Sequence, residues 1–165
     1  MTARSALVLA AALTLTGCSK KVISPLDRAE AANMASEADF AMNVHEWARA
    51  EGLYAKAAAL CPDSGDTWIT LGVARMKLND HSGAKSAYKS AVGAFKSAFE
   101  SDPSDSQALE KQAYVLVLLG RQDDARSVAA GARKDHPEDR LLRQFVDGGE
   151  LERMIADPGL RDISP

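Results

Sequence analysis

Histidine and cysteine are the side chains in this sequence that could bind a metal or act as a nucleophile. The histidines are His45, His81 and His136. Each lies near a predicted helix end in a different part of the chain, whereas a metal site needs ligands that converge within one coordination shell. His45-Glu46 begins like a zinc-protease motif, but the position four residues after His45 holds Arg49 instead of a second histidine. No histidine lies near Cys61 in the sequence to activate its thiol. We therefore expect no catalytic residue, no metal site and no cofactor.

Cys18 ends an N-terminal segment that has the features of a signal peptide. Arg4 precedes an apolar run over residues 5–15 that is too short to span a bilayer as a helix. Residues 15–18 end in Gly17-Cys18 and resemble the lipobox of bacterial lipoproteins. The resemblance implies cleavage after Gly17 and several acyl chains on Cys18, a number that gives stable anchoring. The alternative is an ordinary signal peptide with a chance cysteine.

The residues after Cys18 indicate in which membrane the protein lies, and the charge of the mature chain indicates which partners to expect. In such lipoproteins an Asp directly after the cysteine often marks retention in the inner membrane, and here the residue is Ser19. The resemblance therefore implies the periplasmic face of the outer membrane. Lys20 and Lys21 either attract anionic head groups or belong to a solvated tether. Cleavage removes one basic and no acidic residue and leaves 19 basic and 23 acidic residues, so we expect no nucleic-acid binding.

Cys61 is the only thiol left once Cys18 is lipidated, so no disulfide is expected within the chain. An odd cysteine in an oxidising compartment can be reactive. A cysteine just before Pro62 at a helix end is more typical of a small packed residue.

Small and aromatic residues recur along the rest of the chain with a fixed period. The 165 residues are 46% hydrophobic but only 5% aromatic, which is typical of an Ala-rich helical domain. Ala84, Tyr88 and Ala91 lie 34 positions after Ala50, Tyr54 and Ala57, and Ala91, Ala98 and Pro103 lie 34 positions before Ala125, Ala132 and Pro137. With Trp68, Leu71 and Gly72 ahead of the second set, the pattern resembles the tetratricopeptide repeat (TPR). The resemblance implies an all-α, right-handed α-α superhelix of about three helix pairs with a C-terminal capping helix, a fold that binds other proteins.

The same pattern divides the chain into segments. We expect a signal peptide over 1–17, a lipidated tether over 18–24, a TPR domain over 25–147, and a short helix with a tail over 148–165. The expected repeats span about 31–64, 65–105 and 106–139, followed by a cap over 137–147 that begins at Pro137. Ser24 with Asp27, and Ser104 with Gln107, have the spacing of capping boxes. The tail beyond Asp157 is expected to fray or to dock weakly.

The second repeat carries an insertion of one heptad. Pro103 follows Pro62 by 41 positions, whereas the other repeated residues recur every 34 positions. One heptad makes two helical turns and preserves the buried face, so one helix is expected over 81–101, with Gly93 as its weak point. The added turns bring Phe95 and Phe99, whose apolar side needs cover. That cover comes either from the chain's own neighbouring helices and cap or from a partner protein.

A partner is expected to bind the concave face, which the first helix of each pair lines in stacked repeats. The expected groove residues are Asp39, Met42, Asn43, Ile69, Val73, Met76, Lys77, Lys111, Tyr114 and Val117. They form a mixed, mildly apolar surface. Some TPR domains clamp a C-terminal carboxylate with Lys and Asn, but the matching positions here hold Ala35, Asp39, Ile69 and Val73, so no clamp is expected. Alternatively, the apolar members simply pack against adjacent helices.

These resemblances indicate an architecture more than an activity. Our principal hypothesis is a non-enzymatic protein-protein interaction scaffold or assembly factor, anchored to an envelope membrane by its lipid, whose partners are envelope proteins. Such lipoproteins resemble accessory subunits of pilus systems, of outer-membrane protein assembly and of cell-wall enzyme complexes. One alternative is a self-associating structural lipoprotein that forms homo-oligomers. Another is an accessory part of an envelope enzyme, for which residues 140–165 would offer little room.

Overall fold

The structure is a computed structural model that describes residues 22–165. The signal peptide, the lipobox with Cys18, and Lys20 and Lys21 lie outside the described residues. Within 22–165 the chain forms eight α-helices, one short 3-10 helix and no strand, which confirms the all-α prediction. The helices are α1 (Pro25–Asn43), α2 (Trp47–Leu60), α3 (Gly65–Lys77), α4 (His81–Ser101), α5 (Ser106–Leu118), α6 (Gln122–Asp135), α7 (Arg140–Asp147) and α8 (Glu150–Ala156), followed by the 3-10 helix η1 (Pro158–Ile163).

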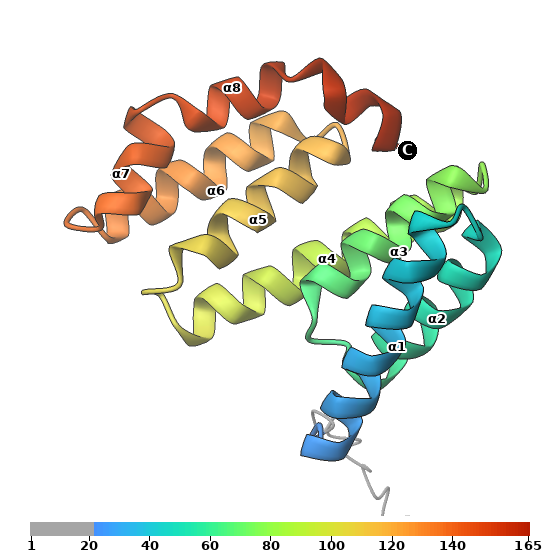
Figure 1. Cartoon of the computed structure of the whole chain (residues 1–165). Helices are drawn as coiled ribbons and strands as arrows, with labels where there is room; N and C mark the ends of the chain where they lie inside the picture. Colours follow the sequence, from blue (N-terminus) through green and yellow to red (C-terminus); the bar gives the residue numbers. More distant parts are fainter. Residues whose placement is uncertain (1–21) are drawn as a thin grey trace, which may run out of the picture.

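The helices pack in the order in which they occur in the chain, each against the next, from α1 to α8 (Figure 1). Alanines at the repeated positions, such as Ala50, Ala84 and Ala125, are fully buried where neighbouring helices meet. Their small side chains let the helix axes approach closely, and larger residues such as Tyr54 and Tyr88 fill the space around them. The period seen in the sequence therefore corresponds to a repeated helix-helix contact. Along residues 22–165, no helix has the length and apolar character that crossing a bilayer requires.

The start of α1 follows the predicted capping box. The Ser24 hydroxyl accepts a hydrogen bond from the Asp27 N–H at 3.0 Å, and the Ser24 N–H donates to the Asp27 carboxylate at 3.2 Å. Pro25 occupies the first helical turn, where its missing N–H costs no hydrogen bond. The predicted helix start at Ser24 is confirmed.

Two predicted helix starts are wrong. The N-cap of α5 is Asp105, which accepts from the Ala108 N–H at 3.1 Å, while the Ser104 hydroxyl instead donates to Asp102 at 2.6 Å. The cap segment does not begin its helix at Pro137, because Asp139 is the N-cap of α7. Asp139 accepts from the N–H groups of Leu141 and Leu142 at 2.8 Å and 3.0 Å. The hydrogen bond from the Leu142 N–H contributes most to lowering the pKa of Asp139, and the bond from Leu141 adds to this effect.

The lengthened helix is continuous, since α4 spans 21 residues and passes through Gly93 without a break. Phe95 is buried against α3 and α5, and the Lys111 ammonium lies 5.7 Å from its ring centroid. Phe99 packs with Leu109 of α5 and Leu142 of α7. The chain therefore covers the apolar side of the inserted heptad itself, with the neighbouring helices and the cap. Phe95 therefore needs no partner protein to cover it, whereas Phe99 stays half-buried.

Candidate protein-binding groove

The expected groove is the face that α1, α3 and α5 present, and the structure places its ten expected residues in several different environments. Asp39, Asn43 and Lys77 are exposed. Ile69, Met76 and Tyr114 are half-buried and pack against one buried cluster formed by α4 and α5, while Met42 packs in the N-terminal core and Val73 is half-buried. Lys111 forms an ion pair with Asp66 at 2.9 Å. Val117 is only 7% exposed, because Phe145 and Leu151 pack in the same cluster.

A segment from the C-terminus lies on part of this face. We call α8 and η1 together the C-terminal arm. Both contact α5, and η1 also contacts α3, so the arm runs back across the array toward the α3–α4 pair (Figure 1). Leu160 and Ile163 of η1 pack in the same cluster as Met76 and Tyr114. The expectation that the tail frays is therefore corrected: η1 docks on the face of α3 and α5 where the groove is expected.

One hydrogen bond ties the end of the arm to the core of the array. The Tyr88 hydroxyl donates to the carbonyl oxygen of Ile163 at 2.7 Å. Tyr88 itself is 0% exposed, and this burial raises its pKa, with a smaller contribution from Tyr114. The phenol therefore stays neutral and acts as a hydrogen-bond donor to η1.

The equivalent tyrosine of the first repeat is satisfied differently. Tyr54 stands one repeat before Tyr88, and its hydroxyl donates to the carboxylate of Asp39 on α1. Burial and the neighbouring Asp39 raise the pKa of Tyr54 as well. The residue one repeat after Asp39 is Val73, which has no polar side-chain atom. The second repeat thus lacks the built-in acceptor of the first, and the C-terminal arm supplies one.

The arm residues were not predicted as part of the groove. Their signal in the sequence is weak, because Leu160 and Ile163 are two apolar residues three positions apart in a six-residue segment. The start of that segment is readable, since Asp157 precedes Pro158 and its carboxylate accepts from the Gly159 N–H at 2.8 Å. What the sequence does not state is the surface on which so short a segment docks.

A hollow that does not include the expected groove residues, which we call the lateral hollow, lies near the beginning of α1. Its volume is about 790 Å³, and it is lined by Ile23, Arg28, Pro62, Asp63, Trp68, Ser90, Gly93, Ala94, Ser97, Ala98 and Ser101. The lining includes a row of small residues on α4, on the helix that carries the inserted heptad.

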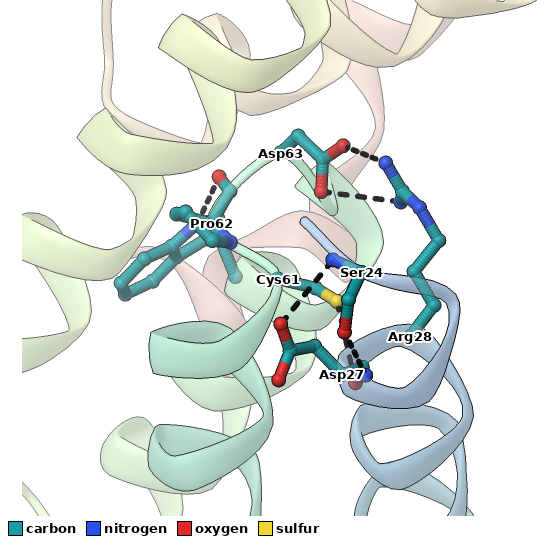
Figure 2. Close-up of polar contacts among 7 residues, drawn as sticks. Ser24, Asp27, Arg28, Cys61, Pro62 and Asp63 are labelled. Carbon is teal, nitrogen blue, oxygen red and sulfur yellow. Dashed lines mark hydrogen bonds and ion pairs between the residues drawn. The ribbon is translucent and has the colours of Figure 1, made fainter. Parts of the chain in front are cut away.

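Polar contacts among residues that line the lateral hollow join α1 to the turn between α2 and α3 (Figure 2). The Arg28 guanidinium reaches the Asp63 carboxylate at 2.7 Å, and the Trp68 indole N–H donates to the Pro62 carbonyl at 3.0 Å. Cys61 is buried between these groups, with its Sγ 3.7 Å from the Asp27 carbonyl oxygen. The interpretation of Cys61 as a small packed residue is confirmed.

The three histidines lie at separate turns. His45 has a left-handed backbone with φ of 61° and contacts the Trp47 ring edge-on at 4.8 Å between centroids, while His136 contacts Phe99 in the same way at 5.9 Å. His81 is exposed at the first residue of α4. In the described part of the chain, no three His, Cys, Asp or Glu side chains gather as a metal site would require.

The fold defines the class of protein. Helix pairs that repeat equivalent residues at a fixed period stack in chain order, which is a TPR-like, all-helical repeat fold. No protein-family model and no curated protein matches the sequence. Among solved structures, the chain is similar to the first TPR of Spaghetti (RPAP3) bound to the HSP90 peptide SRMEEVD, with 14% identity and a TM-score of 0.46 over 79% of this chain and 99% of that one.

Proposed function

We propose that this protein is a non-enzymatic protein-protein interaction scaffold that is anchored in the cell envelope by a lipid on Cys18. The observation that supports the interaction function is the polypeptide segment η1, which docks on the face of α3 and α5 where the groove is expected. Its apolar side chains pack between α3 and α5, and the Tyr88 hydroxyl binds its backbone. A groove that holds a peptide in this way has the chemistry of a peptide-binding surface.

The anchoring half of the proposal is supported by the sequence at residues 15–18 and by the position of the first helix. Since α1 begins at Pro25, six residues from Cys18 to Ile23 precede its N-cap Ser24. An extended segment of that length reaches about 20 Å. The groove would therefore lie close to the membrane surface, where partners in the same membrane are accessible. Ser19 favours the periplasmic face of the outer membrane.

Cys18→Ser should abolish membrane anchoring. Because the acyl chains have no other attachment residue near the cleavage site, the variant should accumulate as uncleaved precursor or leave the membrane fraction. Cell fractionation and the mobility of the protein on gels measure both outcomes. Cys61→Ser is the matched control, since the buried Cys61 side chain should not affect partitioning. A Cys18→Ser protein that is processed and partitions with membranes as before would contradict the anchoring proposal.

If the protein is an interaction scaffold, its partner proteins in cells should contact the expected groove residues. A photo-crosslinking amino acid at the exposed groove positions Asn43 or Lys77 should give a discrete adduct with another envelope protein. The same amino acid at Lys56 of α2 or Lys89 of α4, which are exposed on the second helices of their pairs, should not. Adducts that are identical from all four positions, or absent from both groove positions, would contradict the proposal. Adducts only between copies of this chain would favour a self-associating lipoprotein instead.

A further inference from the structure

The two ends of the C-terminal arm are buried to different degrees. In α8, Leu151 is buried with Phe145, and Glu152 accepts two hydrogen bonds from Arg126 at 2.8 Å and 2.9 Å. In η1, by contrast, Leu160 and Ile163 are both only half-buried. Residues 156–159, from the end of α8 to the start of η1, are exposed. The side chains of η1 are therefore less deeply buried than Leu151 of α8.

The position of η1 coincides with a polar difference between the first two repeats. In the first repeat, Asp39 on the groove face accepts the tyrosine hydroxyl, whereas in the second repeat Val73 stands at that position and the hydroxyl of Tyr88 turns to the backbone of Ile163. A buried hydroxyl that loses its partner is costly. The second repeat is thus completed only when a segment with a backbone carbonyl lies in the groove.

We propose that η1 is a displaceable internal ligand, and that the groove between α3 and α5 recognises a short segment of a partner protein with the same chemistry. That segment presents two apolar side chains three residues apart to the buried cluster against which Ile69, Met76 and Tyr114 also pack, and a backbone carbonyl to Tyr88. This inference rests on the proposed interaction function and names both its ligand class and its regulation. A partner binds by replacing η1 while α8 stays in place.

Because η1 is tethered to the array, η1 and an external peptide compete for the same site. A segment joined to its own site by a few residues has an effective concentration in the millimolar range, so an external peptide binds more weakly while η1 is docked. Weakening η1 alone should expose the groove without changing the remainder of the array. The chain offers a substitution for this purpose, because the half-buried Ile163 contacts the groove whereas Pro165 is exposed two residues later.

The test uses the purified full chain and a fluorescent peptide with the sequence of residues 157–165 as the probe. Ile163→Asp in the protein should release η1, because a charge is costly in the apolar cluster. Fluorescence anisotropy should then show peptide binding at least about tenfold tighter than for the unchanged chain. Pro165→Asp adds the same charge outside the cluster and should bind as weakly as the unchanged chain. A probe carrying Leu160→Asp should not bind any of the proteins.

The hydrogen bond gives a second, independent measurement. Adding Tyr88→Phe to the Ile163→Asp protein removes one hydroxyl and should weaken peptide binding by about 2–10-fold. Adding Val73→Asp should also weaken it, because a carboxylate equivalent to Asp39 would accept the Tyr88 hydroxyl within the array. Circular dichroism and thermal unfolding verify that each variant is folded. If Ile163→Asp misfolds, Leu160→Asp in the full chain with the unchanged peptide tests the same contact.

Three outcomes would overturn the inference. The first is a folded Ile163→Asp protein that binds the peptide no better than the unchanged chain. The second is binding that Tyr88→Phe and Val73→Asp leave unchanged. The third is light scattering that shows the unchanged chain as a dimer through exchanged arms, because the occupant would then be a second copy. Any of these can occur while the crosslinks from Asn43 and Lys77 persist, so the failure of this inference is distinguishable from the failure of the proposed function.

Discussion

Phe95→Ala should lower the free energy of unfolding by about 3–5 kcal/mol, the range for truncating a buried aromatic side chain. Phe95 is 6% exposed and packs between α3 and α5. Its ring lies so close to Gly65 that a Cβ atom there would be 2.5 Å from it. Because the backbone of α3 rests on this ring, we expect the cavity left by alanine to relax only in part. Equilibrium unfolding in urea, followed by circular dichroism, measures the loss.

Phe40→Ala is the matched control for this prediction. Phe40 lies on α1 and is 60% exposed, so its truncation should change the free energy of unfolding by no more than about 0.5 kcal/mol. Equal effects of the two substitutions, or a loss below about 1 kcal/mol for Phe95→Ala, would show that the inserted heptad is not part of the core. Deleting residues 92–98 removes the same ring and should likewise unfold the chain.

The parts of this fold that could be predicted from sequence are those in which one local pattern determines one contact. The spacing of Ala84, Tyr88 and Ala91 places them on one side of α4, and all three are buried there. The start of α1 has one clear signal, the sequence of Ser24, Pro25 and Asp27, and the helix begins there in the structure. The insertion was interpretable for the same reason, since adding two whole turns leaves the buried side of a helix unchanged.

The errors arose where two local patterns competed. Ser104 and Asp105 are both good N-cap residues, and the choice between them depends on Asp102, which accepts from the Ser104 hydroxyl and so leaves Asp105 to cap α5. In the same way Pro137 could begin a helix, but Asp139 caps one two residues later. Side-chain hydrogen bonds within a turn decide such cases, and sequence spacing does not contain them.

The candidate groove was only partly predictable, because its occupant comes from elsewhere in the chain. A periodic pattern identifies which residues of α3 and α5 share a face, and Ile69, Met76 and Tyr114 do lie in one cluster. It does not show that α8 packs near Val117, or that the Tyr88 hydroxyl reaches Ile163, 75 residues later. Docking of a short segment depends on the shape of the surface that receives it, and that shape exists only after the array has folded.

Two glycine substitutions should change the stability of the array in opposite directions. Gly72 lies on α3 under Tyr88, and a Cβ atom at this position would overlap the nearest atoms of the Tyr88 ring. The ring has little freedom to move, because Tyr88 is fully buried and its hydroxyl is bound to Ile163. Gly72→Ala should therefore lower the free energy of unfolding by about 1–3 kcal/mol, the usual cost of overpacking.

Gly93 lies on α4, and a Cβ atom at this position would have no heavy atom of a neighbouring group within 4 Å, so an added methyl group meets open space. Alanine is the better residue in a helix interior and reduces the entropy of the unfolded chain, so Gly93→Ala should raise the free energy of unfolding by about 0.4–1 kcal/mol. Urea unfolding of both variants beside the unchanged chain measures the sign of each change in the free energy of unfolding. If Gly72→Ala stabilises the chain as Gly93→Ala does, then Tyr88 does not lie on α3. In that case the equivalence of the two tyrosines, and with it the floor of the groove, would have to be abandoned.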